Sequence, residues 1–138
     1  MRTLLTIFLL VLPFSAAAQQ RDSFFDSYGD YVDFVDNHII NRNFIELIQV
    51  LGGRDEYKAG QLQDIEDQMR STFPNNFVGG ALARRVELES GFSQEMRVYW
   101  DADLGYNFFY AVLHQRPDGV VVLRFAMNSN IDKILAKF

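Results

Sequence analysis

A predicted β-hairpin over residues 106–127 constrains the fold of this chain more than any other segment. Two runs rich in aromatic and β-branched residues flank the sequence Arg116-Pro117-Asp118-Gly119, a pattern typical of antiparallel strands joined by a tight turn. Proline presets φ at the first turn position and glycine accepts a positive φ, which favours a three-residue loop with a glycine bulge. This loop pairs Arg116 with Val120, His114 with Val122, Val112 with Arg124 and Tyr110 with Ala126.

The two faces of this hairpin differ in composition, because side chains alternate across a strand. One face is wholly apolar and is the expected core face, with Phe109, Ala111, Leu113, Val121, Leu123, Phe125 and Met127. The other face mixes aromatic, aliphatic and charged groups, namely Tyr106, Phe108, Tyr110, Val112, His114, Val122, Arg124 and Ala126. A shift of one residue would exchange the faces, so the assignment depends on the turn.

Three helices are predicted before the hairpin from apolar residues at three- and four-residue spacing. They are expected at residues 23–41, 43–51 and 56–72. Gly29 indicates that the regular part of the first helix begins near Asp30. Asn43 and Glu46 form a capping-box pattern that opens the second helix.

Aspartates occupy much of the polar side of the first predicted helix, at positions 22, 26, 30, 33 and 36. Such a stripe is consistent with a solvated surface, or with a site for a cation or a basic partner. Calcium loops fold around their ion with turns, whereas these residues follow a helix. The solvated surface is therefore the favoured interpretation.

Two strands are predicted between the helices and the hairpin, at residues 83–90 and 95–101, because apolar and polar residues alternate there. Residues 75–80 are interpreted as a loop, since they contain an asparagine pair and a glycine pair. On the second of these strands we expect Met96, Val98 and Trp100 to face the core. A short segment at the end, residues 131–138, is expected to be helical.

Helices followed by a meander of four antiparallel strands indicate an α+β fold with the helices on one face of a curved sheet. Over residues 30–127 this order of elements resembles the nuclear-transport-factor-2-like (cystatin-like) superfamily, which includes polyketide cyclases and ketosteroid isomerases. The resemblance implies a cone-shaped domain with a helix-roofed cavity on the concave sheet face and dimerisation through the convex face. It does not imply a particular chemistry, because the fold hosts enzymes and non-enzymes. Many members have a strand between the second and third helices, which this sequence lacks.

The first residues have the three parts of a secretory signal peptide. Arg2 supplies the positive charge, residues 4–14 the apolar segment and residues 16–18 the small-residue cleavage site. The apolar segment has about half of the ~20 residues that a membrane-spanning helix needs, so no membrane anchor is expected after cleavage. We therefore expect a signal peptide at 1–18, a flexible lead at 19–29 and a single α+β domain at 30–138.

The net charge and the cysteine content restrict the classes of partner that the protein can bind and the cellular compartment in which it is expected. The formal net charge of −5 argues against a nucleic-acid partner, because proteins that bind nucleic acid normally present a basic face. The chain has no cysteine, so an exported protein of this sequence forms no disulfide. With the signal peptide, these features predict an exported bacterial protein, either periplasmic or secreted.

The sequence contains no catalytic, cofactor or metal signature, so we expect no catalytic residue, no cofactor and no metal ligand. The predicted concave cavity is lined by apolar side chains, namely Trp100, Phe109, Leu113, Leu123 and Phe125. Such a cavity could hold an apolar small molecule, or it could be filled by its own large side chains. An enzyme would need an acid–base group from the helices, where Tyr31, His38 and Tyr57 are conceivable.

The convex face of the hairpin is a candidate interface, because aromatic residues together with an arginine are enriched at interface centres. Its residues are Tyr106, Phe108, Tyr110, His114 and Arg124. They predict a homodimer, or alternatively burial under the terminal segment through Ile131, Ile134, Leu135 and Phe138. The sequence thus predicts an exported, non-catalytic domain for binding or self-association, with an isomerase- or cyclase-like enzyme as the alternative.

Overall fold

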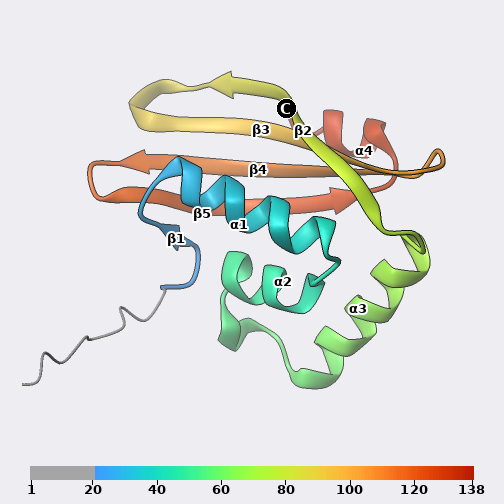
Figure 1. Cartoon of the computed structure of the whole chain (residues 1–138). Coiled ribbons are helices and arrows are strands. Elements are labelled where there is room, and N and C mark those ends of the chain that lie inside the picture. The colour runs from blue at the N-terminus through green and yellow to red at the C-terminus, as the bar shows by residue number, and fades with distance from the viewer. Residues whose placement is uncertain (1–20) are drawn as a thin grey trace, which may run out of the picture.

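The computed structural model describes residues 21–138, which form three helices, an antiparallel sheet and a fourth helix (Figure 1). The helices are α1 (Tyr28–Ile40), α2 (Phe44–Gly52), α3 (Ala59–Thr72) and α4 (Ile131–Leu135). The strands are β1 (Phe24–Phe25), β2 (Phe77–Glu87), β3 (Phe92–Asp101), β4 (Tyr106–Arg116) and β5 (Gly119–Asn128). The predicted signal peptide, residues 1–18, lies outside the described residues.

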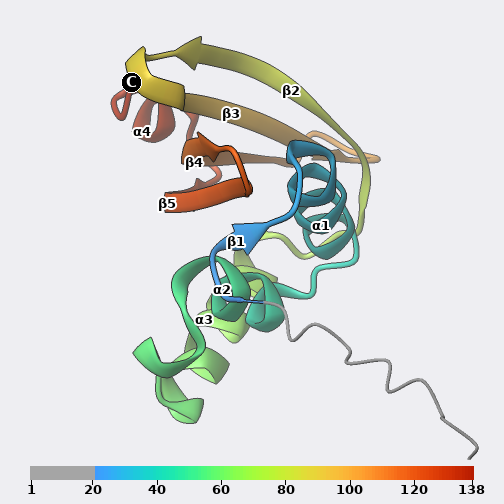
Figure 2. The same cartoon turned by 90° about the vertical axis from the view of Figure 1, so that its left-hand side faces the viewer.

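The α+β class is confirmed, but the sheet has five strands in the order β1-β5-β4-β3-β2 rather than the four predicted. The sheet curves over α1, and α4 lies on its opposite face (Figure 2). α2 contacts α1 and β5, and α3 packs against α2. α1 and α2 therefore cover the concave face, and α4 covers part of the convex face.

β1 is the additional strand, and it is too short to show a periodicity in the sequence. It pairs with the start of β5, and Ser23 extends this pairing by accepting a hydrogen bond from the Val122 amide at 2.8 Å. The Ser23 amide donates to the Val50 carbonyl of α2 at 2.6 Å. α1 consequently begins after β1 rather than at Ser23, and Ser27 caps it by accepting from the Asp30 amide at 3.1 Å.

The pairing of β4 with β5 follows the prediction only at the end far from the turn. The confirmed pairs are Val112–Arg124 and Tyr110–Ala126. Nearer the turn, the pairs are Arg116–Gly119 and His114–Val121 instead of Arg116–Val120 and His114–Val122. The extra residue of β5 is Leu123, at a bulge inside the strand, rather than Gly119 in the loop. Val120 and Val122 are therefore buried, and Leu123 is 52% exposed, which corrects the predicted face of Leu123.

The faces of β3 are the reverse of those predicted. Met96 pairs with Tyr110 and Arg97 with Phe109, so the side chains of Glu95, Arg97 and Tyr99 point toward the helices. The apolar set Met96, Val98 and Trp100 lies on the convex face instead. Alternation alone does not say which set is internal, and here both sets have a cover, because α1 lies over one face and α4 over the other.

β2 begins at Phe77, so Gly79 and Gly80 belong to a strand rather than to the predicted loop. The strand pairing brings both glycines against aromatic rings of β3. A Cβ atom on Gly79 would lie 2.6 Å from the ring of Trp100, and one on Gly80 would lie 2.5 Å from the ring of Tyr99. The glycines are required here because the rings occupy the space of their side chains on the two faces of the sheet.

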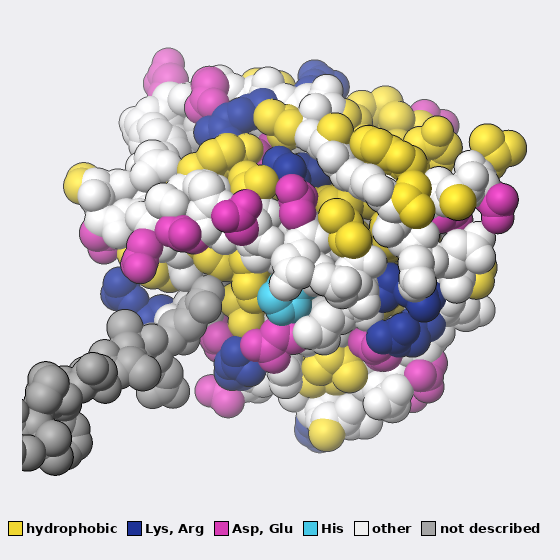
Figure 3. All heavy atoms as spheres, viewed as in Figure 1, with side chains coloured by type: hydrophobic (Ala, Val, Ile, Leu, Met, Phe, Trp, Pro, Cys, Tyr) yellow, Lys and Arg dark blue, Asp and Glu magenta, His cyan; other side chains and the backbone are white. Residues whose placement is uncertain are grey.

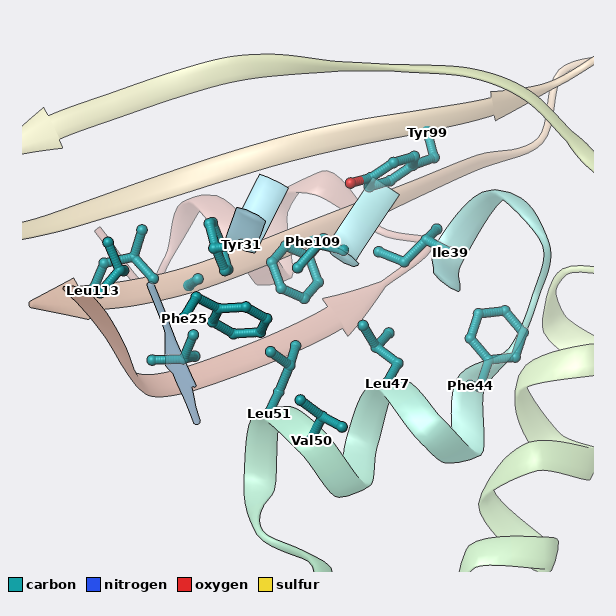
Figure 4. Close-up of a cluster of buried hydrophobic side chains, with 14 of the residues drawn as sticks. Phe25, Tyr31, Ile39, Phe44, Leu47, Val50, Leu51, Tyr99, Phe109 and Leu113 are labelled. Carbon is teal, nitrogen blue, oxygen red and sulfur yellow. The ribbon is translucent and has the colours of Figure 1, made fainter. Parts of the chain in front are cut away.

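The main core fills the space between the helices and the concave face (Figure 4). Its labelled members come from α1, α2 and the strands, and they are Phe25, Tyr31, Ile39, Phe44, Leu47, Val50, Leu51, Tyr99, Phe109 and Leu113. A second cluster joins Met96 and Tyr110 of the convex face to Ile134 of α4, with the ring of Phe138 packed edge-on against Tyr110 at 5.2 Å. α4 is therefore bound to the sheet by an apolar contact of its own.

Candidate functional site

The structure does not bring the five residues of the predicted cavity together. Phe109 and Leu113 are buried among the side chains of the main core, and Phe125 is half-buried. Trp100 lies on the convex face and is 36% exposed, and Leu123 is exposed at the β5 bulge. The centre of the concave face is thus filled by the protein's own side chains, as Figure 4 shows.

An open groove of about 500 Å³ lies at one side of this core, where α2 and α3 face the end of β5. We call it the α3–β5 groove. Its apolar side chains are Ile48, Ile65, Met69, Phe73, Phe125 and Met127. Its polar groups are the phenol, amides and hydroxyls of Tyr57, Gln68, Thr72, Asn128 and Ser129. None of these side chains is an acid or a base of the Asp, Glu, Lys, Arg or His type.

Local sequence patterns explain the lining of the α3–β5 groove. Ile65, Met69 and Thr72 recur at spacings of four and three residues, so they share one face of α3. Phe125 and Met127 are two residues apart on β5, so they share one face of the strand. Each segment is regular in the sequence, but their meeting depends on the path of the chain between them.

α3 is held in place by the carboxylate of Glu66, which is buried on the side toward α2. Glu66 accepts hydrogen bonds from the Ile45 amide at 3.2 Å and from the Arg70 side chain at 2.5 Å. Arg42 donates to the Phe73 carbonyl at 3.0 Å, just beyond the end of α3. Arg70 belongs to α3 itself, whereas the bonds with Ile45 and Arg42 join α3 to the α1–α2 region and thereby position one wall of the groove.

A second pocket of about 580 Å³ adjoins the groove and shares Thr72, Phe73 and Ser129 with it. It also contains Asp101, at the start of the turn between β3 and β4. The amides of Gly105 and Asp103 each donate to Asp101 at 2.9 Å. The hydrogen bond from Gly105 lowers the pKa of Asp101 most, and the bond from Asn75 lowers it further. The carboxylate of Asp101 therefore stabilises the turn.

A polar cluster that the sequence did not reveal lies between α1 and β3. The Glu95 carboxylate is fully buried and accepts hydrogen bonds from Tyr28 at 2.8 Å, Tyr31 at 2.9 Å and Arg85 at 3.2 Å. Burial, followed by the charge of Glu95, raises the pKa of Tyr31 well above its ordinary value. The phenol therefore stays protonated and acts as a hydrogen-bond donor.

The same cluster continues with Asp36 of α1, which binds Arg97 and Tyr99 of β3. Arg97 donates to both Asp36 oxygens, at 3.1 and 3.0 Å, and the Tyr99 hydroxyl donates at 2.5 Å. Burial and the bond to Asp36 raise the pKa of Tyr99. None of the residues of this cluster lines the groove or the second pocket. The cluster therefore joins α1 to the sheet. The one signal of it in the sequence was the alternation of Glu95, Arg97 and Tyr99 along β3.

The three conceivable acid–base residues of the helices are dispersed. Tyr31 belongs to the buried cluster, and Tyr57 lines the α3–β5 groove. His38 shares a hydrogen bond with the Phe34 carbonyl at 2.8 Å, and its ring lies 4.0 Å from the Phe34 ring. The other histidine, His114, stacks on Phe92 on the convex face at 4.1 Å. The two histidines therefore do not meet.

Asp26, Asp30 and Asp33 of the predicted acidic stripe are exposed, and Figure 3 shows acidic side chains in a row over α1. Asp36 is the exception, because it is bound by Arg97 and Tyr99 and does not belong to a solvated surface. Within residues 21–138, no group of three or more His, Cys, Asp or Glu side chains could hold a metal ion.

The candidate interface residues have different environments. Tyr110 is buried under the terminal segment, where its hydroxyl donates to the Lys137 carbonyl at 3.1 Å. Phe108 and His114 are half-buried, Arg124 is exposed and Tyr106 is 46% exposed. The terminal segment therefore covers the centre of the convex face. The end of this face at Tyr106 remains exposed to solvent.

No helix within the described part of the chain is long and apolar enough to cross a membrane. Comparison of the chain with models of protein families, with curated proteins and with solved structures gave no match. The resemblance to the nuclear-transport-factor-2-like superfamily thus stays a prediction from the order of elements.

Proposed function

We propose that this protein is a binding domain that holds an uncharged, largely apolar small molecule in the α3–β5 groove. The observation that carries the proposal is the lining of the groove, in which six apolar side chains are joined by phenol, amide and hydroxyl groups and by no charged group. Sites of a few hundred cubic ångströms with this mixture are typical of small-molecule binding. A charged ligand would lose its hydration in the groove without gaining an ion pair.

The same lining argues for binding rather than catalysis. General acid–base catalysis needs a titratable group within hydrogen-bond reach of the reacting atom. Tyr57 is the one titratable side chain of the groove lining, and the carboxylates of the chain's buried cluster point elsewhere. For an isomerase- or cyclase-like reaction in this groove, the phenol of Tyr57 would therefore be the one available general acid or base.

A matched pair of fluorescent probes tests the proposal. N-phenyl-1-naphthylamine is neutral, and 8-anilino-1-naphthalenesulfonate is the same molecule with an added sulfonate. We expect the neutral probe to bind the purified protein with one-to-one stoichiometry and at least tenfold more tightly than the anionic probe. Equal affinity for both probes, or no binding of the neutral one, would contradict the proposal.

Two tryptophan variants on the same helix assign the binding to the groove. Gln68→Trp places an indole in the groove, whereas Gln63→Trp places one on an exposed position of α3 outside the lining. We expect Gln68→Trp to weaken binding of N-phenyl-1-naphthylamine at least tenfold and Gln63→Trp to leave it unchanged. Equal effects of the two substitutions would place the probe elsewhere.

Self-association through the convex face is a second candidate, supported by apolar side chains beside α4. Trp100 is 36%, Tyr106 46%, Ile131 39% and Leu135 37% exposed. Large apolar side chains gathered on a surface favour a protein contact. A homodimer through this patch should dissociate in the Tyr106→Lys variant, as measured by sedimentation equilibrium. A monomeric wild-type protein would remove this candidate.

A further inference from the structure

We propose that the side-chain amide of Asn107 is a buried anchor for a ligand that carries a hydrogen-bond donor, and that Met127 covers this anchor. The inference rests on the proposed function, because it assigns the chemistry of a ligand in the same groove. The inference starts from the Oδ1 atom of Asn107, a buried acceptor without a hydrogen-bond partner among residues 21–138.

Asn107 lies on β4 opposite Tyr99, with its side chain on the concave face and no exposed surface. Its Nδ2 group donates to the Sδ atom of Met127 at 3.7 Å, and thioethers are weak acceptors. Its Oδ1 atom has no hydrogen-bond partner within residues 21–138. Buried polar atoms are almost always paired, so the unpaired Oδ1 of Asn107 is an exception that calls for an explanation.

The neighbouring polar groups of the concave face make this exception specific. Glu95, Arg97 and Tyr99 are also buried, and each is hydrogen-bonded to a partner on another element. Those bonds join α1 to the sheet and explain why the polar groups are there. Asn107 makes no side-chain hydrogen bond to a described helix, and its one such partner is Met127 of the neighbouring strand β5. Its amide is therefore not explained by the attachment of a helix.

Met127 connects Asn107 to the α3–β5 groove. It contacts the Asn107 amide through its sulfur, and it is itself one of the residues that line the groove. Methionine has an unbranched side chain with three rotatable bonds, so it can change rotamer at low cost. Rotation of Met127 exposes the Asn107 amide to the groove without movement of the backbone.

These contacts define the class of ligand. Its body is uncharged and apolar, because it lies against side chains such as Phe73 and Phe125. It carries a hydroxyl or an N–H group that donates to Oδ1 of Asn107. An apolar alcohol, phenol or amide has this combination of groups.

The test compares 2-naphthol with 2-methylnaphthalene, which replaces the hydroxyl by a methyl group of similar size. Both are measured by displacement of N-phenyl-1-naphthylamine from the full protein and from the Asn107→Leu variant. We expect the preference of the wild-type protein for 2-naphthol to fall about fivefold in Asn107→Leu, the size of one net hydrogen bond. An unchanged preference, or no displacement of the bound probe by either compound, would overturn the inference and leave the proposed function intact. Failure of N-phenyl-1-naphthylamine itself to bind the wild-type protein would overturn both.

Two further measurements separate an anchor from a structural residue. The melting temperature of ligand-free Asn107→Leu is expected to equal or exceed that of the wild-type protein, because the variant removes an unpaired buried acceptor. A large decrease would show that Asn107 serves the fold. Met127→Ala removes the cover and should keep or increase the preference for 2-naphthol, and loss of that preference in a folded Met127→Ala protein would contradict the proposal.

Discussion

The buried carboxylate of Glu95 accepts hydrogen bonds from three side chains. Loss of its charge should therefore lower the stability of the fold. Substitution of Glu95 by glutamine leaves Arg85 without its buried partner and the two phenols with a weaker acceptor. We expect Glu95→Gln to lower the free energy of unfolding by about 3 kcal/mol, as for other broken buried ion pairs. Chemical denaturation with urea measures this loss.

The chain provides a matched control for this substitution. Glu87 also pairs with Arg85, but its side chain is 68% exposed. Exposed ion pairs contribute little, so Glu87→Gln should change the free energy of unfolding by less than about 1 kcal/mol. Similar losses in the two variants would show that burial of Glu95 is not what makes its contacts important.

The buried tyrosines predict a loss of stability in alkali. Burial and the neighbouring carboxylates raise the pKa of Tyr31 and Tyr99 in the folded protein. The unfolded chain releases these protons near pH ~10 while the folded protein retains them, so their stabilising contribution is complete below that pH and declines above it. Tyr99→Phe should reduce the slope above pH ~10 by up to ~1.4 kcal/mol per pH unit. Parallel stability–pH curves for the two proteins would contradict the assignment.

At the scale of elements, α4 should be a stabilising cover of the sheet rather than a loose terminus. Ile134 is fully buried against Met96 and Tyr110, whereas Leu135 on the same helix is 37% exposed. Ile134→Ala is expected to cost about 3 kcal/mol of unfolding free energy, because it leaves a cavity. Leu135→Ala should cost less than about 1 kcal/mol. Equal effects in thermal or urea unfolding would indicate that α4 does not cover the convex face as described.

The sequence predicted elements where a local pattern was sufficient. The α+β order, the position of a turn within residues 116–119 and the distal half of the hairpin follow from periodicity and turn residues. The predicted three-residue loop was wrong, because Arg116 pairs with Gly119 across a two-residue turn. The faces of β3 could not be predicted from local patterns. Two sets of side chains alternate along the strand, and only the positions of α1 and α4 decide which set faces the helices before the sheet. The bulge at Leu123 had no local signal either, since no glycine or proline marks it.

The candidate site was harder to predict than the fold. The α3–β5 groove combines α2 and α3 with the end of β5, and the strands β2, β3 and β4 lie between α3 and β5 along the chain. Periodicity identifies Phe125 and Met127 as core-facing, but it does not say that α3 leaves space beside them. Asn107 was not singled out, because an isolated asparagine in an aromatic strand gives no sign of its partner until the strands are paired.

At the scale of the whole molecule, the helices close the centres of both faces of the sheet and leave the α3–β5 groove at one margin. The convex side is closed over its centre by α4, and the concave side is filled over its centre by α1 and α2. The groove remains at the margin, between α3 and the end of β5. Binding in the groove is therefore compatible with an intact core, and a ligand can enter without unfolding an element.

Methionine methyl NMR can locate a bound molecule in the α3–β5 groove. The chain has four methionines, of which Met69 and Met127 line the groove, while Met96 lies on the convex face under α4. On titration with N-phenyl-1-naphthylamine, we expect the ¹³C-methyl signals of Met69 and Met127 to shift and that of Met96 to stay unchanged. Unchanged Met69 and Met127 signals at saturating probe, or a shift of Met96 alone, would contradict binding in the groove.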